Sequence, residues 1–217
     1  MDLYQLRRKK LFQIEKDSFN LEKNIQKLIE ENLETLFNLE FITSEFAVNN
    51  FRIDTLAYDN ENNSFVIVEY KKGKSYSVID QGYSYLSLML NNKSDFILEY
   101  NERNKKNLKR NEIDWSQSRI IFISPSFNSY QKNSMNFQDV PFELWEIKKF
   151  SKNLIGLNQY ISDSNESIKS VSKNTKNNLI DSVAKEVKVY NKNDFLSNMN
   201  DKMIEIHNQI VEKTSDW

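Results

Sequence analysis

The sequence predicts an α/β fold, in which helices flank a mixed central β-sheet. Short apolar runs rich in Val, Ile and Phe, such as 65–68 and 119–123, indicate buried strands. Between them, segments such as 76–90 carry apolar residues at helical spacing. Helices interleaved with strands are typical of an α/β core. The chain has 217 residues, which is enough to bury a full core in one main domain.

Each expected element has its own local signal. Continuous or alternating apolar runs predict strands, and i, i+3 and i+4 spacing predicts helices. In chain order we expect a helix over 21–37, strands over 51–58 and 64–71 joined by the polar loop 59–63, a helix over 76–90, a short strand over 95–100, a polar helix over 104–111, a buried strand over 119–123, a helix within 127–137, and strands over 141–150 and 154–160 joined by a turn. The first helix has a predicted buried face made of Leu21, Ile25, Leu28, Ile29, Leu33 and Leu36.

The composition divides the chain into three parts. We expect a main domain over 1–161 that folds alone, because Ser, Asn and Lys dominate from 162 to 178 and offer little apolar surface to bury. We interpret 162–178 as a polar linker and 179–217 as an amphipathic helical segment. The last helix has apolar residues at helical spacing, Phe195, Met199, Met203, Ile206 and Ile210. This stripe must be buried against the core, a twin subunit in a homodimer, or a partner.

The composition also excludes several kinds of site. The chain has no cysteine, so disulfides and cysteine-ligated zinc are excluded, and the single His207 excludes a histidine metal cluster. The basic run 7–10 is followed by two apolar residues and then by charge, which is not the pattern of a signal peptide. No segment approaches the roughly 20 apolar residues of a membrane span. We therefore expect a cytoplasmic protein with no membrane contact.

The predicted hairpin over 51–71 brings two carboxylates and a lysine together. A turn centred on Glu61 and Asn62 places Asp54 opposite Glu69 or one residue away, and opposed Cβ atoms lie roughly 4.5–5.5 Å apart. Two carboxylates that close repel each other unless a cation lies between them or one is protonated. Period-two alternation places Lys71 on the same face as Glu69. This arrangement is typical of a metal-dependent hydrolytic site, although a Glu/Lys pair at the end of a strand is often only a surface ion pair.

The following helix carries two further candidates. Gln81 and Tyr85 lie four residues apart on one stripe, from which they could contact a nucleic-acid strand. A capping hydrogen bond for Gln81 and core packing for Tyr85 are the structural alternatives. Net charge is −1, but basic residues gather at 71–74 and 105–110, where they could engage phosphates or simply be solvated.

Three motifs carry a family resemblance. Arg52-x-Asp54, Glu69-x-Lys71 and Gln81-x-x-x-Tyr85 resemble the PD-(D/E)XK nuclease superfamily in its RecB-like arrangement, with Ile53 in place of proline. The run 50–91, with 124–127 and 143–147, also resembles a little-characterised family of cytoplasmic bacterial proteins often labelled as predicted transport proteins. The resemblance covers about 1–161 and implies a restriction-endonuclease-like core.

The superfamily pattern also implies roles for individual residues. It makes Asp54 and Glu69 ligands of Mg²⁺ or Mn²⁺, with the carbonyl of Tyr70 as a further ligand, and Lys71 the group that positions water or stabilises charge. Many relatives add a carboxylate from the preceding helix. The candidates here are Glu22, which we favour, then Glu30, and after them Glu31 and Glu34.

The implied function is metal-dependent hydrolysis of nucleic acid. Gln81, Tyr85, Arg52 and Lys72 are the expected substrate-binding residues. On the resemblance alone we prefer DNA to RNA as substrate, and we expect a place in defence or DNA processing. The alternative is a non-catalytic module that retains the nuclease fold and binds nucleic acid or a protein partner.

Overall fold

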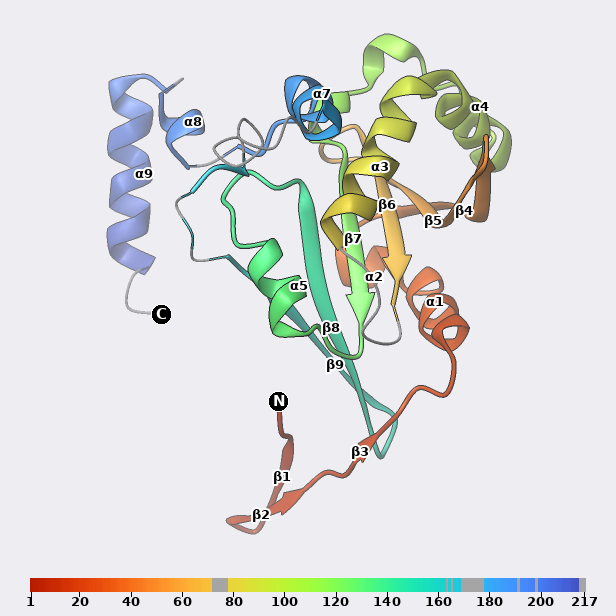
Figure 1. Ribbon diagram of the computed structural model, residues 1–217. Helices are drawn as coiled ribbons and strands as arrows, with labels where there is room; N and C mark the ends of the chain where they lie inside the picture. Colours follow the sequence, from red (N-terminus) through yellow and green to blue (C-terminus); the bar gives the residue numbers. More distant parts are fainter. Residues whose placement is uncertain are drawn as a thin grey trace.

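The computed structural model describes residues 1–71, 78–162, 164, 166–168, 178–190, 192–197 and 199–214. It confirms an α/β fold with a mixed central sheet (Figure 1). The strands are β1 Tyr4–Arg7, β2 Lys10–Gln13, β3 Lys16–Asp17, β4 Glu40–Val48, β5 Phe51–Asp59, β6 Ser64–Tyr70, β7 Arg119–Ser124, β8 Phe142–Phe150 and β9 Leu154–Tyr160. The helices are α1 Glu22–Glu30, α2 Leu33–Phe37, α3 Val78–Asn91, α4 Lys93–Asn104, α5 Ser129–Ser134, α7 Asn178–Glu186, α8 Lys192–Leu196 and α9 Asp201–Thr214, with short 3₁₀ turns η1 Arg110–Glu112 and η2 Trp115–Gln117.

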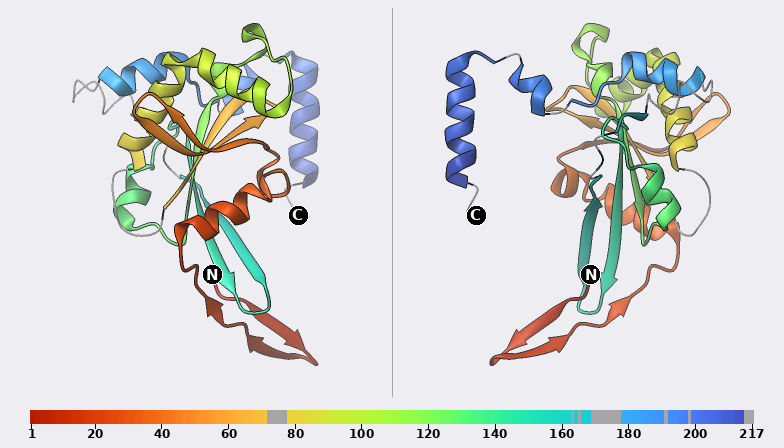
Figure 2. Two further views of the ribbon diagram at one scale, coloured as in Figure 1. Left: turned by 90° about the vertical axis from the view of Figure 1, so that its right-hand side faces the viewer. Right: turned by 60° about the vertical axis from the view of Figure 1, so that its left-hand side comes forward.

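The central sheet has seven strands in the order β3-β8-β7-β6-β5-β4, and β9 also pairs with β8. Strands β4, β5 and β6 form an antiparallel meander, whereas β6, β7 and β8 are parallel. The chain therefore crosses from β6 to β7 through α3 and α4, as parallel neighbours require. Strands β1 and β2 form a separate two-stranded sheet that projects from the body (Figures 1 and 2).

The predicted β5–β6 hairpin is confirmed in position and register. Its pairs run from Asp59↔Ser64 to Thr55↔Val68. The carboxylate of Asp59 closes the turn by accepting hydrogen bonds from the backbone N–H groups of Glu61 and Asn62, each at 3.0 Å. This is the local bonding that favours aspartate at turns. The same register, continued by one step, places Asp54 across from Glu69.

Helices cover both faces of the sheet because side chains alternate along each strand. On one face, Leu56, Tyr58, Phe65 and Ile67 pack with α3, α4 and α7. On the other face, Ala57, Val66, Val68 and Tyr70 pack with Ile25 and Ile29 of α1 and Leu33 of α2. The two faces thus form two apolar layers on either side of the sheet.

Several expected elements differ from the structure. The strand predicted over 95–100 is wrong, because α4 occupies this segment and buries Phe96 and Tyr100 at i, i+4 while Leu98 remains 56% exposed. The helix predicted over 104–111 is also wrong, since Lys105 adopts φ 51° beyond α4 and only the η1 turn follows. The first helix is divided at 31–32, and Leu21, predicted as buried, is 61% exposed.

The C-terminal part begins with a helix that packs on the core. Ile180, Val183 and Val187 are buried, and α7 lies against α3. The apolar stripe of α9 is exposed instead, with Met203 at 55% and Ile210 at 57%. Most of the linker predicted over 162–178 lies outside the described residues. Among the helices that are described, none has both the length and the apolarity needed to span a membrane.

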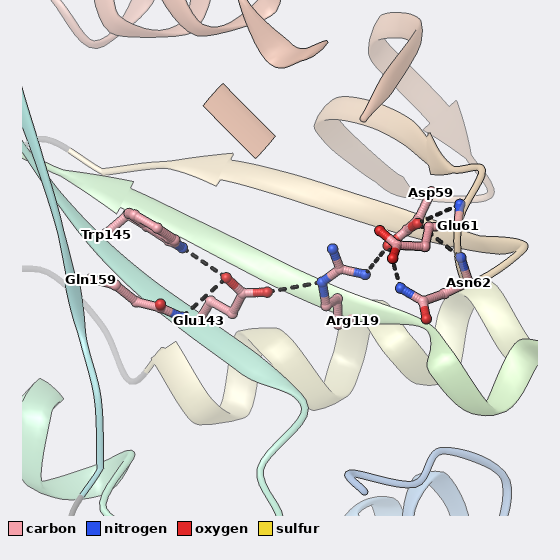
Figure 3. A network of polar contacts seen from close by, with 7 residues as sticks. All are labelled: Asp59, Glu61, Asn62, Arg119, Glu143, Trp145 and Gln159. Atoms are coloured by element: carbon pink, nitrogen blue, oxygen red, sulfur yellow. Dashed lines mark hydrogen bonds and ion pairs between the residues drawn. The ribbon is translucent and has the colours of Figure 1, made fainter. Parts of the chain in front are cut away.

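A polar network ties four strands together at the start of β7 (Figure 3). The guanidinium of Arg119 donates to Asp59 and Glu143, both at 2.8 Å. Glu143 also accepts from the indole of Trp145 at 2.8 Å and from Gln159 at 3.2 Å. The network joins β5, β7, β8 and β9, so it holds the strand order at this end of the sheet.

Candidate active site

The first half of β5 and the end of β6 bring together the predicted acid pair and lysine. The backbone N–H of Tyr70 donates to Asp54 Oδ2 at 3.0 Å, which joins the two strands at the position predicted from the hairpin register. Lys71 Nζ lies 2.8 Å from Glu69 Oε1, so both side chains lie on one face, as the alternation predicts. The side chain of Glu69 is 5% exposed and that of Lys71 is 19% exposed. This is therefore an enclosed ion pair rather than a solvated one.

The two oxygens of Glu69 have different surroundings. Oε1 accepts hydrogen bonds from Lys71 and, at 2.7 Å, from Gln81 Nε2. Oε2 is buried and has no hydrogen-bond partner among the described residues. A buried carboxylate oxygen without a partner is costly. A divalent cation is a natural partner for such an oxygen, because hard cations prefer carboxylate ligands.

Burial also shifts the protonation of both carboxyl groups. Burial, followed by the charge of Glu69, raises the pKa of Asp54 to about 7, although the Tyr70 N–H and Lys71 act in the opposite direction. Burial is also the largest cause that raises the pKa of Glu69, and Lys71 and Gln81 partly offset it. A proton or a cation would relieve the repulsion between the two groups. The pair thus has the electrostatics of a cation site.

Helix α3 supplies the two polar side chains predicted from its spacing. Gln81 Nε2 lies 3.2 Å from the hydroxyl of Tyr85, and that hydroxyl donates to the backbone carbonyl of Arg52 at 3.1 Å. Gly82 lets the helix approach β8 closely, since a Cβ atom there would lie 2.5 Å from Phe142 Cζ. Gln81 and Tyr85 therefore border the acid pair, and they also hold Glu69 and the beginning of β5.

The other two expected substrate-binding residues have different outcomes. The guanidinium of Arg52 forms an ion pair with Glu45, and its side chain is 68% exposed. Lys72 lies outside the described residues. The structure thus brings one further cation to the rim of the site, held by an acidic neighbour on β4.

Helix α1 contributes one structural carboxylate and one that stands near the site. Glu30, the second candidate ligand, accepts hydrogen bonds from Gln26 at 3.0 Å, from Thr55 at 2.5 Å and from Ser44, so its Oε1 is already used inside the fold. Glu22 begins α1, is exposed, and adds to the causes that raise the pKa of Glu69. Gln26 also donates to the backbone carbonyl of Asp54 at 2.9 Å, which fixes α1 against the site.

The side chains of the described residues do not by themselves offer a full set of metal ligands. No three Asp, Glu, His or Cys side chains there converge closely enough to hold an ion. Asp54 and Glu69 would supply two ligands. The remaining positions would require the carbonyl of Tyr70, Glu22, water or substrate oxygens.

Glu45 is a site neighbour that the sequence did not indicate. Its neighbours on β4 pair with β5 as Ser44↔Thr55 and Phe46↔Ile53. Glu45 on β4 therefore lies opposite Asp54 on β5. Its φ of 56° is left-handed, and its charge adds to the causes that raise the pKa of Asp54. The β4 strand itself was not predicted, and without it no pattern connects Glu45 with the acid pair.

Comparison with known proteins gives one close relative and several distant folds. No family model matches the sequence. An uncharacterised protein of Haemophilus influenzae is 48% identical over 208 residues, which cover 95% of this chain and 68% of that protein. This chain belongs to the same family as that protein.

The similar solved structures are more distant. A complex of EndoMS with double-stranded DNA is 19% identical with a TM-score of 0.37, and the match covers 63% of this chain and 50% of that one. A repair endonuclease from Pyrococcus abyssi is 20% identical with a TM-score of 0.31, covering 54% and 43%. SfsA of Pyrococcus furiosus with Ca²⁺ is 14% identical with a TM-score of 0.31, covering 64% and 62%. The chain spans about half the length of the EndoMS chain, and these similarities concern the fold alone.

Proposed function

We propose that this chain is a divalent-metal-dependent nuclease that hydrolyses phosphodiester bonds of nucleic acid, with DNA preferred to RNA. The observation that carries the proposal is the buried Glu69 Oε2, which lacks a hydrogen-bond partner among the described residues and belongs to the carboxylate whose charge acts on Asp54. Lys71 donates to the other oxygen of Glu69, Oε1, at 2.8 Å. We further propose a cytoplasmic location and a place in defence or DNA processing.

The donor set fits Mg²⁺ or Mn²⁺. Both ions prefer oxygen ligands, and Asp54 and Glu69 offer carboxylate oxygens from adjacent strands. We propose the carbonyl of Tyr70 and the carboxylate of Glu22 as further ligands. When bound, the cation would polarise the scissile phosphate and lower the pKa of a coordinated water.

The protein's own groups have separate proposed tasks. Lys71 would stabilise the charge that develops on the phosphate, or hold the attacking water, from its place 2.8 Å from Glu69. Gln81 would keep Glu69 oriented through its 2.7 Å hydrogen bond. Arg52 and Lys72 would bind flanking phosphates, and Tyr85 fixes the backbone of Arg52.

One observation favours a second candidate, a non-catalytic module that binds nucleic acid or a protein. Among the described residues no three metal-binding side chains converge, and Glu69 Oε1 already has two donors. A fold that had lost hydrolysis could retain such a neutralised carboxylate. The two candidates differ in whether any divalent cation supports cleavage.

A substrate panel tests the proposal. The purified protein would be incubated with single-stranded DNA, linear duplex DNA, plasmid and RNA, each with Mg²⁺, with Mn²⁺ and with EDTA. The proposal predicts cleavage of at least one DNA substrate with a divalent cation and none with EDTA. Binding without cleavage under every condition would favour the non-catalytic module.

A further inference from the structure

The β1–β2 hairpin is the part of the described chain least explained by the fold. It is a two-stranded sheet of its own, paired from Tyr4↔Gln13 to Arg7↔Lys10. It projects beyond the body at the end of the sheet where β6 and β7 finish (Figures 1 and 2). Isolated two-stranded hairpins are marginally stable in water. A projecting hairpin of this kind therefore suggests a role outside the core.

Its tip concentrates positive charge. Arg7, Arg8, Lys9 and Lys10 are consecutive and exposed, and residues 3–14 contain no acidic residue. None of the ion pairs found in the described ranges involves any of these four residues. Among the described residues, the one side-chain contact found for these four is the ring of Phe12, 5.9 Å from the guanidinium carbon of Arg7. The chain as a whole has a net charge of −1, so this is a local excess of positive charge.

The turn residues are poorly suited to the turn. Arg8 has φ 46° and Lys9 has φ 65°, so both central residues are left-handed. Two-residue hairpin turns of this kind strongly favour Asn-Gly, because other residues pay roughly 1–2 kcal/mol each for a left-handed backbone. Positions that break a local rule without a structural gain are often functional. The tip therefore keeps its cations at a cost in turn stability.

The base of the hairpin is held by polar contacts to the body, and no contact of this kind is found for the tip among the described residues. Lys152, in the β8–β9 turn, donates to Gln5 Oε1 at 2.7 Å. Ser151 donates its backbone N–H to the carbonyl of Glu15 at 2.8 Å. Lys16 pairs with Asp2 at 2.8 Å. These contacts fix the direction in which the hairpin projects, so that the tip is presented on a defined arm.

We propose that the hairpin tip is a second nucleic-acid contact, which binds duplex DNA outside the candidate active site. Its four cations would contact phosphates, and the major groove is wide enough for a two-stranded ribbon. The choice of partner rests on the proposed function, whereas the residues are separate from those of the candidate active site. Leu6 and Leu11, 68% and 67% exposed, could alternatively face a protein or a membrane, and the uncompensated charge favours DNA.

The test uses a variant that improves the turn while removing charge. Arg8→Asn combined with Lys9→Gly should leave the melting temperature equal or higher, because Asn-Gly suits the turn. It should weaken duplex binding by roughly 10- to 100-fold at about 0.1 M salt and lower the slope of log K against log salt by about 2. Binding would be measured by fluorescence anisotropy of a labelled duplex in EDTA, where no metal-dependent cleavage occurs.

Two matched variants control for charge. The exchange Arg8→Lys with Lys9→Arg keeps both charges and should bind like the parent. Lys202→Ala with Lys213→Ala removes two exposed cations from α9 and should bind like the parent as well. Undiminished binding by the Asn-Gly variant would overturn the inference, and so would an equal loss in the α9 variant. Tip-dependent binding to phosphatidylserine vesicles, or tip-dependent self-association seen by light scattering, in the absence of duplex binding would also overturn it.

The assay separates this inference from the proposed function. Because binding is measured in EDTA, a parent without cleavage activity can still show tip-dependent binding. Normal cleavage with unchanged duplex binding by the Asn-Gly variant would reject the hairpin contact alone.

Discussion

Replacing Asp54 by Asn should stabilise the metal-free protein, and increasingly so as the pH rises. The pKa of Asp54 is raised from 3.8 to about 7, so its folded state favours the proton. Protonated Asp54 therefore contributes to the stability of the folded state. This contribution is fully present below about pH 4, which is the pKa of the group in the unfolded chain, and is lost as the pH rises to about 7. The introduced amide is neutral throughout, and its oxygen can still accept the hydrogen bond from Tyr70 N–H.

The size of the effect follows from linkage. Each unit of pKa corresponds to about 1.4 kcal/mol, so the penalty in the parent at pH 8 has an upper limit of about 4 kcal/mol. Even 1–2 kcal/mol would raise the melting temperature by about 2–8 °C in a chain of this size. Burial is the largest cause of the raised pKa of Asp54, and the charge of Glu69, whose own pKa is also raised, adds to it, so we expect a gain below the upper limit.

Thermal unfolding in EDTA at pH 5, 6, 7 and 8 measures this gain. Glu61→Gln, which changes an exposed loop carboxylate, is the matched control and should change the melting temperature little at every pH. With saturating Mg²⁺ the order should reverse, because only the parent gains the free energy of metal binding. A difference between variant and parent that does not grow with pH, or a variant less stable than the parent at pH 8 in EDTA, would refute the electrostatic reasoning.

The remaining predictions concern the lysine, the polar network and the C-terminal helices. Lys71→Ala should lower the rate of single-turnover cleavage by roughly 10²–10⁴-fold. Its affinity for Mn²⁺, measured by calorimetric titration, should be nearly unchanged. Cleavage by this variant at the parental rate would exclude a catalytic role for Lys71. Arg119→Met should lower the free energy of unfolding by about 1–3 kcal/mol, because two carboxylates lose a donor, and denaturant titration measures this against Arg119→Lys. A chain ending at 190 should melt near the parent temperature, since the apolar side chains of α9 are exposed. One ending at 161 should melt lower, because it loses the buried side chains of Ile180, Val183 and Val187, worth roughly 1.5–3 kcal/mol each.

The candidate site could be predicted because its information is local. One hairpin sets the relation between Asp54, Glu69 and Lys71, and its register depends on a short polar loop closed by Asp59. Gln81 lies on the next helix, α3, and the four-residue spacing of Gln81 and Tyr85 placed both side chains on one side of that helix. The contact from Gln81 to Glu69 also depends on how closely α3 approaches the sheet, which spacing alone does not indicate.

The features that were missed depend on tertiary contacts or break local rules. The β4 strand lies at the edge of the sheet and is half-exposed, so its residues lack a clean apolar pattern. The segment 95–100 contains the short apolar run 96–98, which resembles a strand, yet the burial of Phe96 and Tyr100 on one helix face determines its structure. The β1–β2 turn places Arg8 and Lys9 where Asn-Gly would be expected, so it carried no turn signal. Glu30 was a candidate metal ligand by sequence, but its Oε1 accepts hydrogen bonds from Ser44 on β4 and Thr55 on β5, and no local pattern indicates these contacts.

The central claim is that Asp54 and Glu69 hold a divalent cation that enables cleavage. The most direct measurement is single-turnover cleavage of a labelled DNA duplex over a range of Mg²⁺ concentrations, comparing the parent with Glu69→Gln and with the loop control Glu61→Gln. We predict saturable, Mg²⁺-dependent cleavage by the parent and the control. Glu69→Gln should lose at least about 100-fold in rate while keeping a cooperative thermal transition, because one of the two proposed carboxylate ligands is gone. Cleavage by Glu69→Gln at the parental rate, or parental cleavage that persists in EDTA, would contradict the claim.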